Sequence, residues 1–136
     1  MIVLDTSGLL AALDSAQRSH EDARAALESD AGPLLLSPFV LAELDYLLST
    51  RIGIEAAMLL LDQVADGAYH LESFGPEDVR AAIEVINAYR DLGIGLADAS
   101  IVVIAARAGT NRVLTLDGRH FRALRTLPGG AFELLP

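Results

Sequence analysis

Apolar residues along this chain fall into two kinds of segment, short continuous runs and longer stretches with helical spacing. Short runs bounded by turn residues are typical of buried strands, whereas apolar residues three and four positions apart indicate amphipathic helices. The predicted strands are residues 2–4, 32–37, 68–74, 112–117 and 131–136. The predicted helices are residues 7–14, 19–29, 37–50, 53–66, 75–93 and 95–109.

Start and stop signals support several of these helices. Ser37 stands where a helix N-cap is expected and Pro38 follows at the first helical position, where its missing N–H costs nothing. Ser19 is a plausible N-cap for the second helix, and Gly93 marks the end of the helix that begins near residue 75. The helix over 95–109 is apolar on almost every side, which predicts a buried, central position.

The alternation of strands and helices predicts an α/β fold, a sandwich with a mostly parallel central sheet flanked by helices. A length of 136 residues fits a single domain over residues 1–136. In such sheets, sites form at the carboxyl ends of the strands. Asp5 and Asp117 both stand at the ends of predicted strands.

Composition narrows the class of protein. A hydrophobic content of 52% and a mean hydropathy of +0.40 indicate a folded chain. No apolar run is long enough to span a bilayer, no signal-peptide pattern is present and there is no cysteine, so we expect a cytoplasmic protein that does not enter the membrane. All ten basic residues are arginine, which excludes lysine-based chemistry.

The chain is acidic, with a formal net charge of −9 and a pI of about 4.6. This charge argues against non-specific binding to nucleic acid over the whole surface. It is compatible with a site that requires a cation, or with a basic protein partner.

Four carboxylates have mostly apolar neighbours in the sequence: Asp5, Glu43, Asp98 and Asp117. Four converging carboxylates cannot all stay ionised without a cation, and Mg²⁺ prefers such ligands together with water and phosphate oxygens. A metal held there can activate water against a phosphodiester. Each residue also has a simpler explanation. Asp5 fits a helix cap, Glu43 a solvent-facing helix position, Asp98 a first helical turn and Asp117 a turn before glycine.

Four stretches in this order, "MIVLDTSGLLAAL", "SPFVLAELDYLL", "GLADASIVVIAAR" and "RVLTLDGRHF", resemble the PIN-domain ribonucleases. More narrowly, they are similar to the VapC toxins of bacterial toxin–antitoxin modules, and the similarity extends to the final "AFELLP". The resemblance implies a PIN-like fold and a metal-dependent endoribonuclease that cleaves tRNA or rRNA.

The resemblance also implies roles for the acidic residues. Asp5 and Asp98 would be the main ligands of Mg²⁺ or Mn²⁺, Asp117 would complete a second metal position, and Glu43 would orient metal-bound water. Thr6 and Thr115 would support this pocket. The protein would form a homodimer and would be inhibited by a small VapB-like antitoxin, which lies along an apolar groove and places a basic side chain in the acidic pocket.

A basic cluster surrounds Asp117 in the sequence, and its members are Arg112, Arg119, Arg122, Arg125 and His120. Arg112, Arg119 and Arg122 are predicted to contact RNA phosphates beside the metal. The alternative is a solvated helix face. His120 has the chemistry of a general base, but a surface or packing role is the preferred interpretation, because a metal-activated water does not require it.

Two other functions compete with the nuclease. A phosphatase of the haloacid dehalogenase type also has an aspartate after an apolar strand, but Ser7 stands where such enzymes have a second aspartate, and lysine is absent. A non-catalytic module could use the acidic pocket only to receive a basic peptide. Such a module would keep its partner after chelation, whereas a nuclease would lose its activity.

Overall fold

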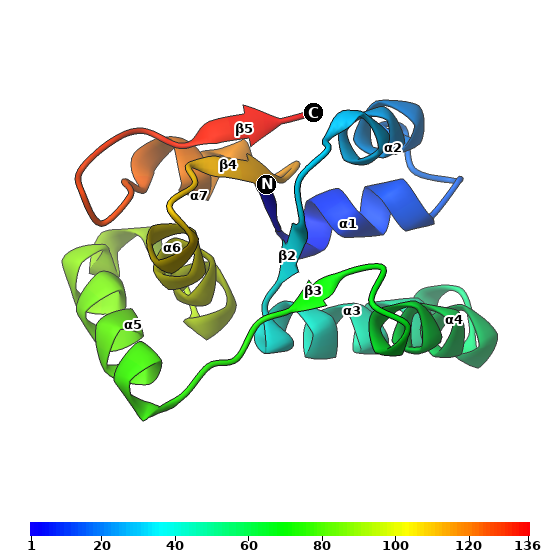
Figure 1. Cartoon of the computed structure of the whole chain (residues 1–136), viewed down its shortest axis with the longest axis horizontal. Coiled ribbons are helices and arrows are strands. Elements are labelled where there is room, and N and C mark those ends of the chain that lie inside the picture. Colours follow the sequence, from blue (N-terminus) through cyan, green and yellow to red (C-terminus); the bar gives the residue numbers. More distant parts are fainter.

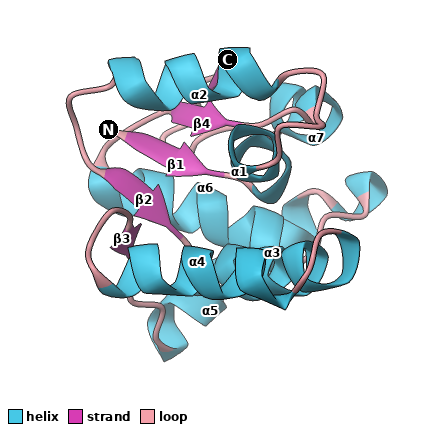
Figure 2. Cartoon of the chain, turned by 90° about the vertical axis from the view of Figure 1, so that its right-hand side faces the viewer, coloured by secondary structure: helices cyan, strands magenta, loops and turns pink.

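The computed structural model describes all residues from 1 to 136 and contains one parallel sheet in the order β3-β2-β1-β4-β5. The strands are β1 (Ile2–Leu4), β2 (Leu34–Leu36), β3 (His70–Leu71), β4 (Arg112–Leu114) and β5 (Glu133–Leu135). Figure 2 shows β4, β1 and β2 side by side and pointing the same way. Because parallel strands require crossovers, helices separate them in the sequence.

Seven α-helices and one 3₁₀ helix connect the strands. They are α1 (Thr6–Leu13), α2 (His20–Ser29), α3 (Pro38–Arg51), α4 (Ile54–Ala65), α5 (Pro76–Ala88), η1 (Arg90–Leu92), α6 (Leu96–Ala108) and α7 (Gly118–Ala123). Figure 1 shows the pair α5 and α6 on one side of the sheet and the pairs α1 with α2 and α3 with α4 on the other. This α/β/α arrangement confirms the predicted fold class. None of the helices combines the length and apolarity needed to cross a bilayer.

The core lies between the central strands and the helices. All three residues of β1 are fully buried, and every residue of α6 from Ala99 to Ala105 is buried, as its all-round apolar sequence predicts. At the start of α1, Gly8 lies so close to β4 that an added Cβ would stand 2.3 Å from the Leu114 carbonyl oxygen. Gly8 therefore allows α1 to approach the end of β4.

The position of the site follows from the strand order. The chain proceeds outward from β1 to β3 on one side of β1, and then returns to place β4 on its other side. The crevice beyond the carboxyl ends of the strands at such a reversal is the usual ligand site of open α/β sheets. Asp5 follows β1 directly, and Asp117 follows β4 after two residues.

Several predicted boundaries differ from the structure, most of them by one to three residues. Strand β4 ends at Leu114 instead of residue 117, because the Thr115 hydroxyl accepts the Asp117 N–H and turns the chain into α7, a helix that the pattern did not predict. The strand predicted over 68–74 is only His70–Leu71, an exposed edge strand. The helix predicted over 75–93 ends at Ala88, where Tyr89 leaves the helical conformation and its hydroxyl accepts the Arg125 N–H. The strand predicted over 131–136 is limited to Glu133–Leu135.

Candidate active site

A cleft of about 380 Å³ opens at the carboxyl ends of β1 and β4. The four predicted acidic residues, Asp5, Glu43, Asp98 and Asp117, all line it. They come from four places far apart in the sequence: the end of β1, the middle of α3, the first turn of α6 and the start of α7. The fold therefore gathers in one cleft the residues that the sequence analysis selected for their apolar neighbours.

Asp5 is held rigidly by two hydroxyl groups. Ser7 Oγ and Thr115 Oγ1 each donate to Asp5 Oδ2 at 2.7 Å. Each hydroxyl also accepts a backbone N–H from the loop after β4, from Leu116 to Ser7 and from Asp117 to Thr115, both at 2.9 Å. Because the second carboxylate oxygen, Asp5 Oδ1, has no partner in the protein and is not fully buried, it can bind a ligand in the cleft.

The surroundings of Asp98 perturb its pKa. Burial raises the pKa of Asp98 above its usual range, and the neighbouring charge of Asp5 raises it further. His120 acts in the opposite direction, since its Nδ1 lies 3.2 Å from Asp98 Oδ2. His120 Nδ1 is also 3.6 Å from Asp117 Oδ2, so this ring lies between the two carboxylates.

Glu43 reaches the cleft from α3, and a buried pair of serines fixes the start of that helix. Ser37 Oγ accepts the Phe39 N–H as an N-cap and lies 2.7 Å from Ser100 Oγ of α6. Both serines are completely buried. This contact joins the first turns of α3 and α6, so it positions Glu43 relative to Asp98.

The residues of the cleft fit a hard divalent cation. All four carboxylates supply the oxygen ligands that Mg²⁺ prefers, and a cation would relieve the burial and repulsion that raise the pKa of Asp98. As the side chains stand, no three acidic or histidine groups are arranged to hold one ion together. The donor set therefore fits an ion bound by one or two carboxylates and completed by water, which is the usual arrangement for Mg²⁺.

Two residues of the cleft carry functions that the sequence analysis did not give them. Ser7 holds Asp5, whereas Thr6, the predicted supporting residue, lines the cleft without a hydrogen bond to any of the four carboxylates. The sequence did contain a signal for this contact, because Ser7 is the second hydroxyl residue after Asp5 in "DTS". His120, which the sequence analysis preferred to place at the surface or in packing, contacts Asp98 inside the cleft. Thr115, the other supporting residue that the resemblance implies, donates a hydrogen bond to Asp5.

The basic cluster around Asp117 divides in the structure. Arg119 and Arg122 are exposed on α7, beside the cleft but not among its lining residues. The predicted placement of Arg112 near the cleft is wrong. Arg112 begins β4 and Asp117 lies beyond its other end, so the length of the strand separates them.

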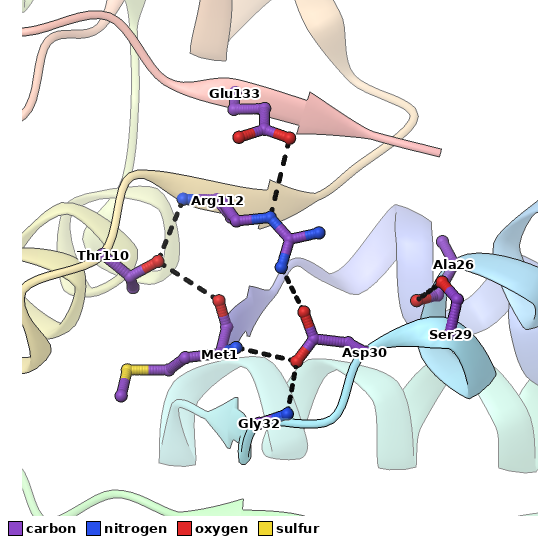
Figure 3. Close-up of polar contacts among 8 residues, drawn as sticks. All are labelled: Met1, Ala26, Ser29, Asp30, Gly32, Thr110, Arg112 and Glu133. Atoms are coloured by element: carbon purple, nitrogen blue, oxygen red, sulfur yellow. Dashed lines mark hydrogen bonds and ion pairs between the residues drawn. The ribbon is translucent and has the colours of Figure 1, made fainter.

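Figure 3 shows what Arg112 does instead. Its guanidinium forms an ion pair with Asp30 and a longer one with Glu133, at 3.6 Å. Asp30, with a side chain only 4% exposed, also accepts the Gly32 N–H at 2.8 Å and the Met1 ammonium at 2.7 Å. Arg112 thus joins β4 to β5 and to the loop before β2, at the amino ends of the strands, away from the cleft.

Comparison with known proteins agrees with this geometry. The family model of the PIN domain matches residues 2–126. Over 135 residues the chain is 43% identical to Ribonuclease VapC26 of Mycobacterium tuberculosis, covering 99% of this chain and 100% of that protein. The crystal structure of M. tuberculosis VapC20, described as a Sarcin-Ricin loop cleaving toxin, matches with a TM-score of 0.86 at 22% identity over the whole of both chains. The structure of VapBC2 from Rickettsia felis, bound to a DNA fragment from its promoter, matches with a TM-score of 0.71 at 22% identity, also over both chains.

The family match, together with the fold and the acidic cleft, shows that the chain belongs to the PIN domain family. Within that family it is similar over its full length to a VapC ribonuclease. The haloacid dehalogenase alternative is therefore wrong, because that interpretation required a different family.

Proposed function

We propose that this protein is a Mg²⁺- or Mn²⁺-dependent endoribonuclease of the VapC type that cleaves tRNA or rRNA and acts as the toxin of a toxin–antitoxin module. The observation that carries the proposal is the convergence of Asp5, Glu43, Asp98 and Asp117 on one cleft at the switch point of the sheet. The 43% identity to a VapC ribonuclease supports the same activity. RNA recognition of this kind depends on loop shape and unstacked bases, which a small open cleft can accommodate.

The residues of the cleft have distinct tasks in this reaction. When bound, the divalent ion supplies an activated water and stabilises charge on the phosphodiester. Asp5, oriented by Ser7 and Thr115, presents its free Oδ1 to the ion. Asp98 would be the other main ligand of that ion and Asp117 would complete a second metal position, while His120 Nδ1 lies between these two carboxylates. Glu43, on the α3 side of the cleft, would hold or orient the metal-bound water.

Cleavage of total cellular RNA tests the activity. Purified protein should produce a discrete fragment with Mg²⁺, and neither EDTA-treated protein nor the Asp98→Asn variant should produce it. Asp45→Asn is the matched control, since Asp45 is on the same helix as Glu43 but does not line the cleft. Equal cleavage by the wild type and Asp98→Asn would refute the proposal and leave the non-catalytic binding module as the better explanation.

The proposal extends to a VapB-like antitoxin and to a homodimer of the toxin. An apolar groove of about 200 Å³ lies between the end of α1, α3 and α4, and its lining includes Leu48, Ile52 and Leu59. Leu13 of this groove follows Leu10 of the acidic cleft by one helical turn, so the two are neighbours along α1. A peptide in the groove can therefore extend a basic side chain into the cleft.

A further inference from the structure

Arg51 is the one arginine that lines the acidic cleft. It stands in the last turn of α3, and its spacing of four and eight residues from Leu47 and Glu43 places all three on one face of the helix. The same face of α3 therefore presents a carboxylate to the cleft and, two turns further on, a cation at its edge.

The guanidinium of Arg51 is free to bind a ligand. Arg24, Arg107 and Arg112 are held by carboxylate partners. Arg51 is exposed and has neither an ion pair nor a side-chain hydrogen bond within the protein, although it lines the acidic cleft. The charge of Arg51 contributes to lowering the pKa of Asp14. The pKa of Asp14 is lowered chiefly by hydrogen bonds from Gln17 and the Ala16 N–H, and Arg51 makes only the smallest contribution.

We propose that Arg51 binds a backbone phosphate of the RNA strand where the strand crosses the α3 edge of the cleft. The assignment rests on the endoribonuclease function proposed above. A guanidinium matches the geometry of a phosphate and forms paired hydrogen bonds with it, which makes arginine the preferred side chain for this contact. In a cleft with four carboxylates, Arg51 offsets their repulsion of the polyanion and positions the strand; it does not take part in the chemical step.

The test is RNA binding as a function of salt. The protein carries Asp98→Asn so that RNA is not cleaved. The probe is a fluorescein-labelled single-stranded oligouridylate of about twelve nucleotides, within the usual range of single-strand site sizes. A phosphate contact carries no sequence information, so any single strand should report it. The variants are Arg51→Gln, Arg51→Lys and the matched control Arg80→Gln, an exposed arginine of α5 outside the cleft.

We expect Arg51→Gln to raise Kd about five- to tenfold at low salt and to reduce the slope of log Kd against log salt by about 0.7, the value for one phosphate contact on a single strand. Arg51→Lys should retain the slope, since the charge remains. Arg80→Gln should match the parent. In the background with Asp98 intact, Arg51→Gln should raise KM for the RNA cut by the wild type and change kcat less than about twofold.

Two results would overturn the proposal in different ways. If Arg51→Gln keeps the parental slope and Kd, Arg51 acts only on the helix terminus and the nuclease function is unaffected. If the parent does not bind the oligouridylate at low salt and the wild type does not cleave cellular RNA, the proposed function fails and the role of Arg51 fails with it.

Discussion

Asp5 illustrates how individual residues prepare this site. A carboxylate at the end of a buried strand is costly to desolvate, and two hydroxyl donors compensate for that cost at one of its oxygens. Both hydroxyls are themselves fixed by N–H groups of the loop after β4. The orientation of Asp5 therefore depends on residues that need not touch the substrate.

Removing one of these hydroxyls should reduce activity without unfolding the protein. Ser7→Ala or Thr115→Val should each lower the rate of RNA cleavage by about 10- to 100-fold, the usual effect of losing a group that orients a metal ligand. The double variant should lose less activity than the product of the two single-variant factors, because both hydroxyls act on the same oxygen. Initial rates of RNA cleavage at fixed Mg²⁺ measure these factors.

Thr6→Ala is the control, since Thr6 is as buried as Asp5 and lines the same cleft without bonding to it. An equal loss of rate in Thr6→Ala would mean that general disturbance of the cleft, and not the orientation of Asp5, explains the effect.

At the residue scale, the sequence was sufficient to select the four carboxylates, because a charged side chain among apolar neighbours requires a partner. It was not sufficient to assign the contacts between them. Nothing local distinguishes Ser7 from Thr6 as the donor to Asp5, since the choice depends on how α1 starts. Arg112 was misplaced because it is close to Asp117 in the sequence. In the structure, the length of strand β4 separates the two residues.

At the scale of elements, the close approach of α1 and β4 joins two halves of the site. Gly8→Ala should destabilise the protein by about 1–3 kcal/mol, because the new Cβ would stand 2.3 Å from the Leu114 carbonyl oxygen and force the helix away. Urea unfolding measures the loss, and cleavage should fall as well, since Ser7 and Thr115 lie on the two separated elements. Gly75→Ala, where a Cβ meets nothing within 4 Å, should cost no more than about 1 kcal/mol. Equal losses in both variants would contradict this account.

The Asp30 network holds together the ends of the strands away from the cleft, and it predicts a dependence on pH. The Met1 ammonium, the Gly32 N–H and Arg112 hold the pKa of Asp30 at about 2, below its ordinary value of 3.8. A lowered pKa means that the ionised form stabilises the fold above pH 3.8, and that this stabilisation is lost as the pH falls through 2.

Asp30→Asn should therefore lower Tm at pH 7, and the difference from the wild type should shrink as the pH falls from about 4 to about 2. Thermal melts followed by circular dichroism at several pH values measure the difference, with the exposed Asp62→Asn of α4 as the control. A constant difference at all pH values would show that the packing of the Asp30 side chain, and not its charge, stabilises the fold.

The helices and strands were predicted best where their boundaries have a local chemical cause. Ser37 and Pro38 begin α3 as predicted, because capping is a property of neighbouring residues. Strand β3 is much shorter than its apolar pattern suggests, because an edge strand extends only as far as its single neighbour pairs with it. Helix α7 entered only as the alternative interpretation of the basic cluster, because its six residues are too few to show a period.

At the scale of the whole molecule, two surfaces meet along α1 and α3, the acidic cleft and the apolar groove. The strand alternation predicted the class of fold but not the order β3-β2-β1-β4-β5, which depends on pairing between distant segments. That order places the cleft at the reversal of the sheet, and the crossover through α3 and α4 places the groove beside it. Under the proposed function, RNA cleavage in the cleft and antitoxin binding in the groove should therefore be separable by mutation.

Leu59→Glu provides this separation, because Leu59 is 60% exposed on the wall of the groove. We expect inhibition by the cognate antitoxin to weaken at least about tenfold, since a charge would be buried against an apolar partner, while RNA cleavage stays at the wild-type rate. Ile83→Glu, at a similarly exposed apolar position on α5, should leave both properties unchanged. Loss of RNA cleavage by the Leu59→Glu variant, or full inhibition of this variant by the antitoxin, would contradict the separation.

The central claim is that the four carboxylates form a metal site, and calorimetric titration of the protein with Mg²⁺ or Mn²⁺ tests it most directly. The account predicts saturable binding to the wild type, the same binding to Asp45→Asn, and affinity reduced at least about tenfold in Asp98→Asn. Asp98→Asn should also raise the Tm of the metal-free protein, because it removes a carboxylate whose ionisation burial and Asp5 disfavour. Equal metal binding by the wild type and Asp98→Asn would contradict the account, because the ion would then bind elsewhere.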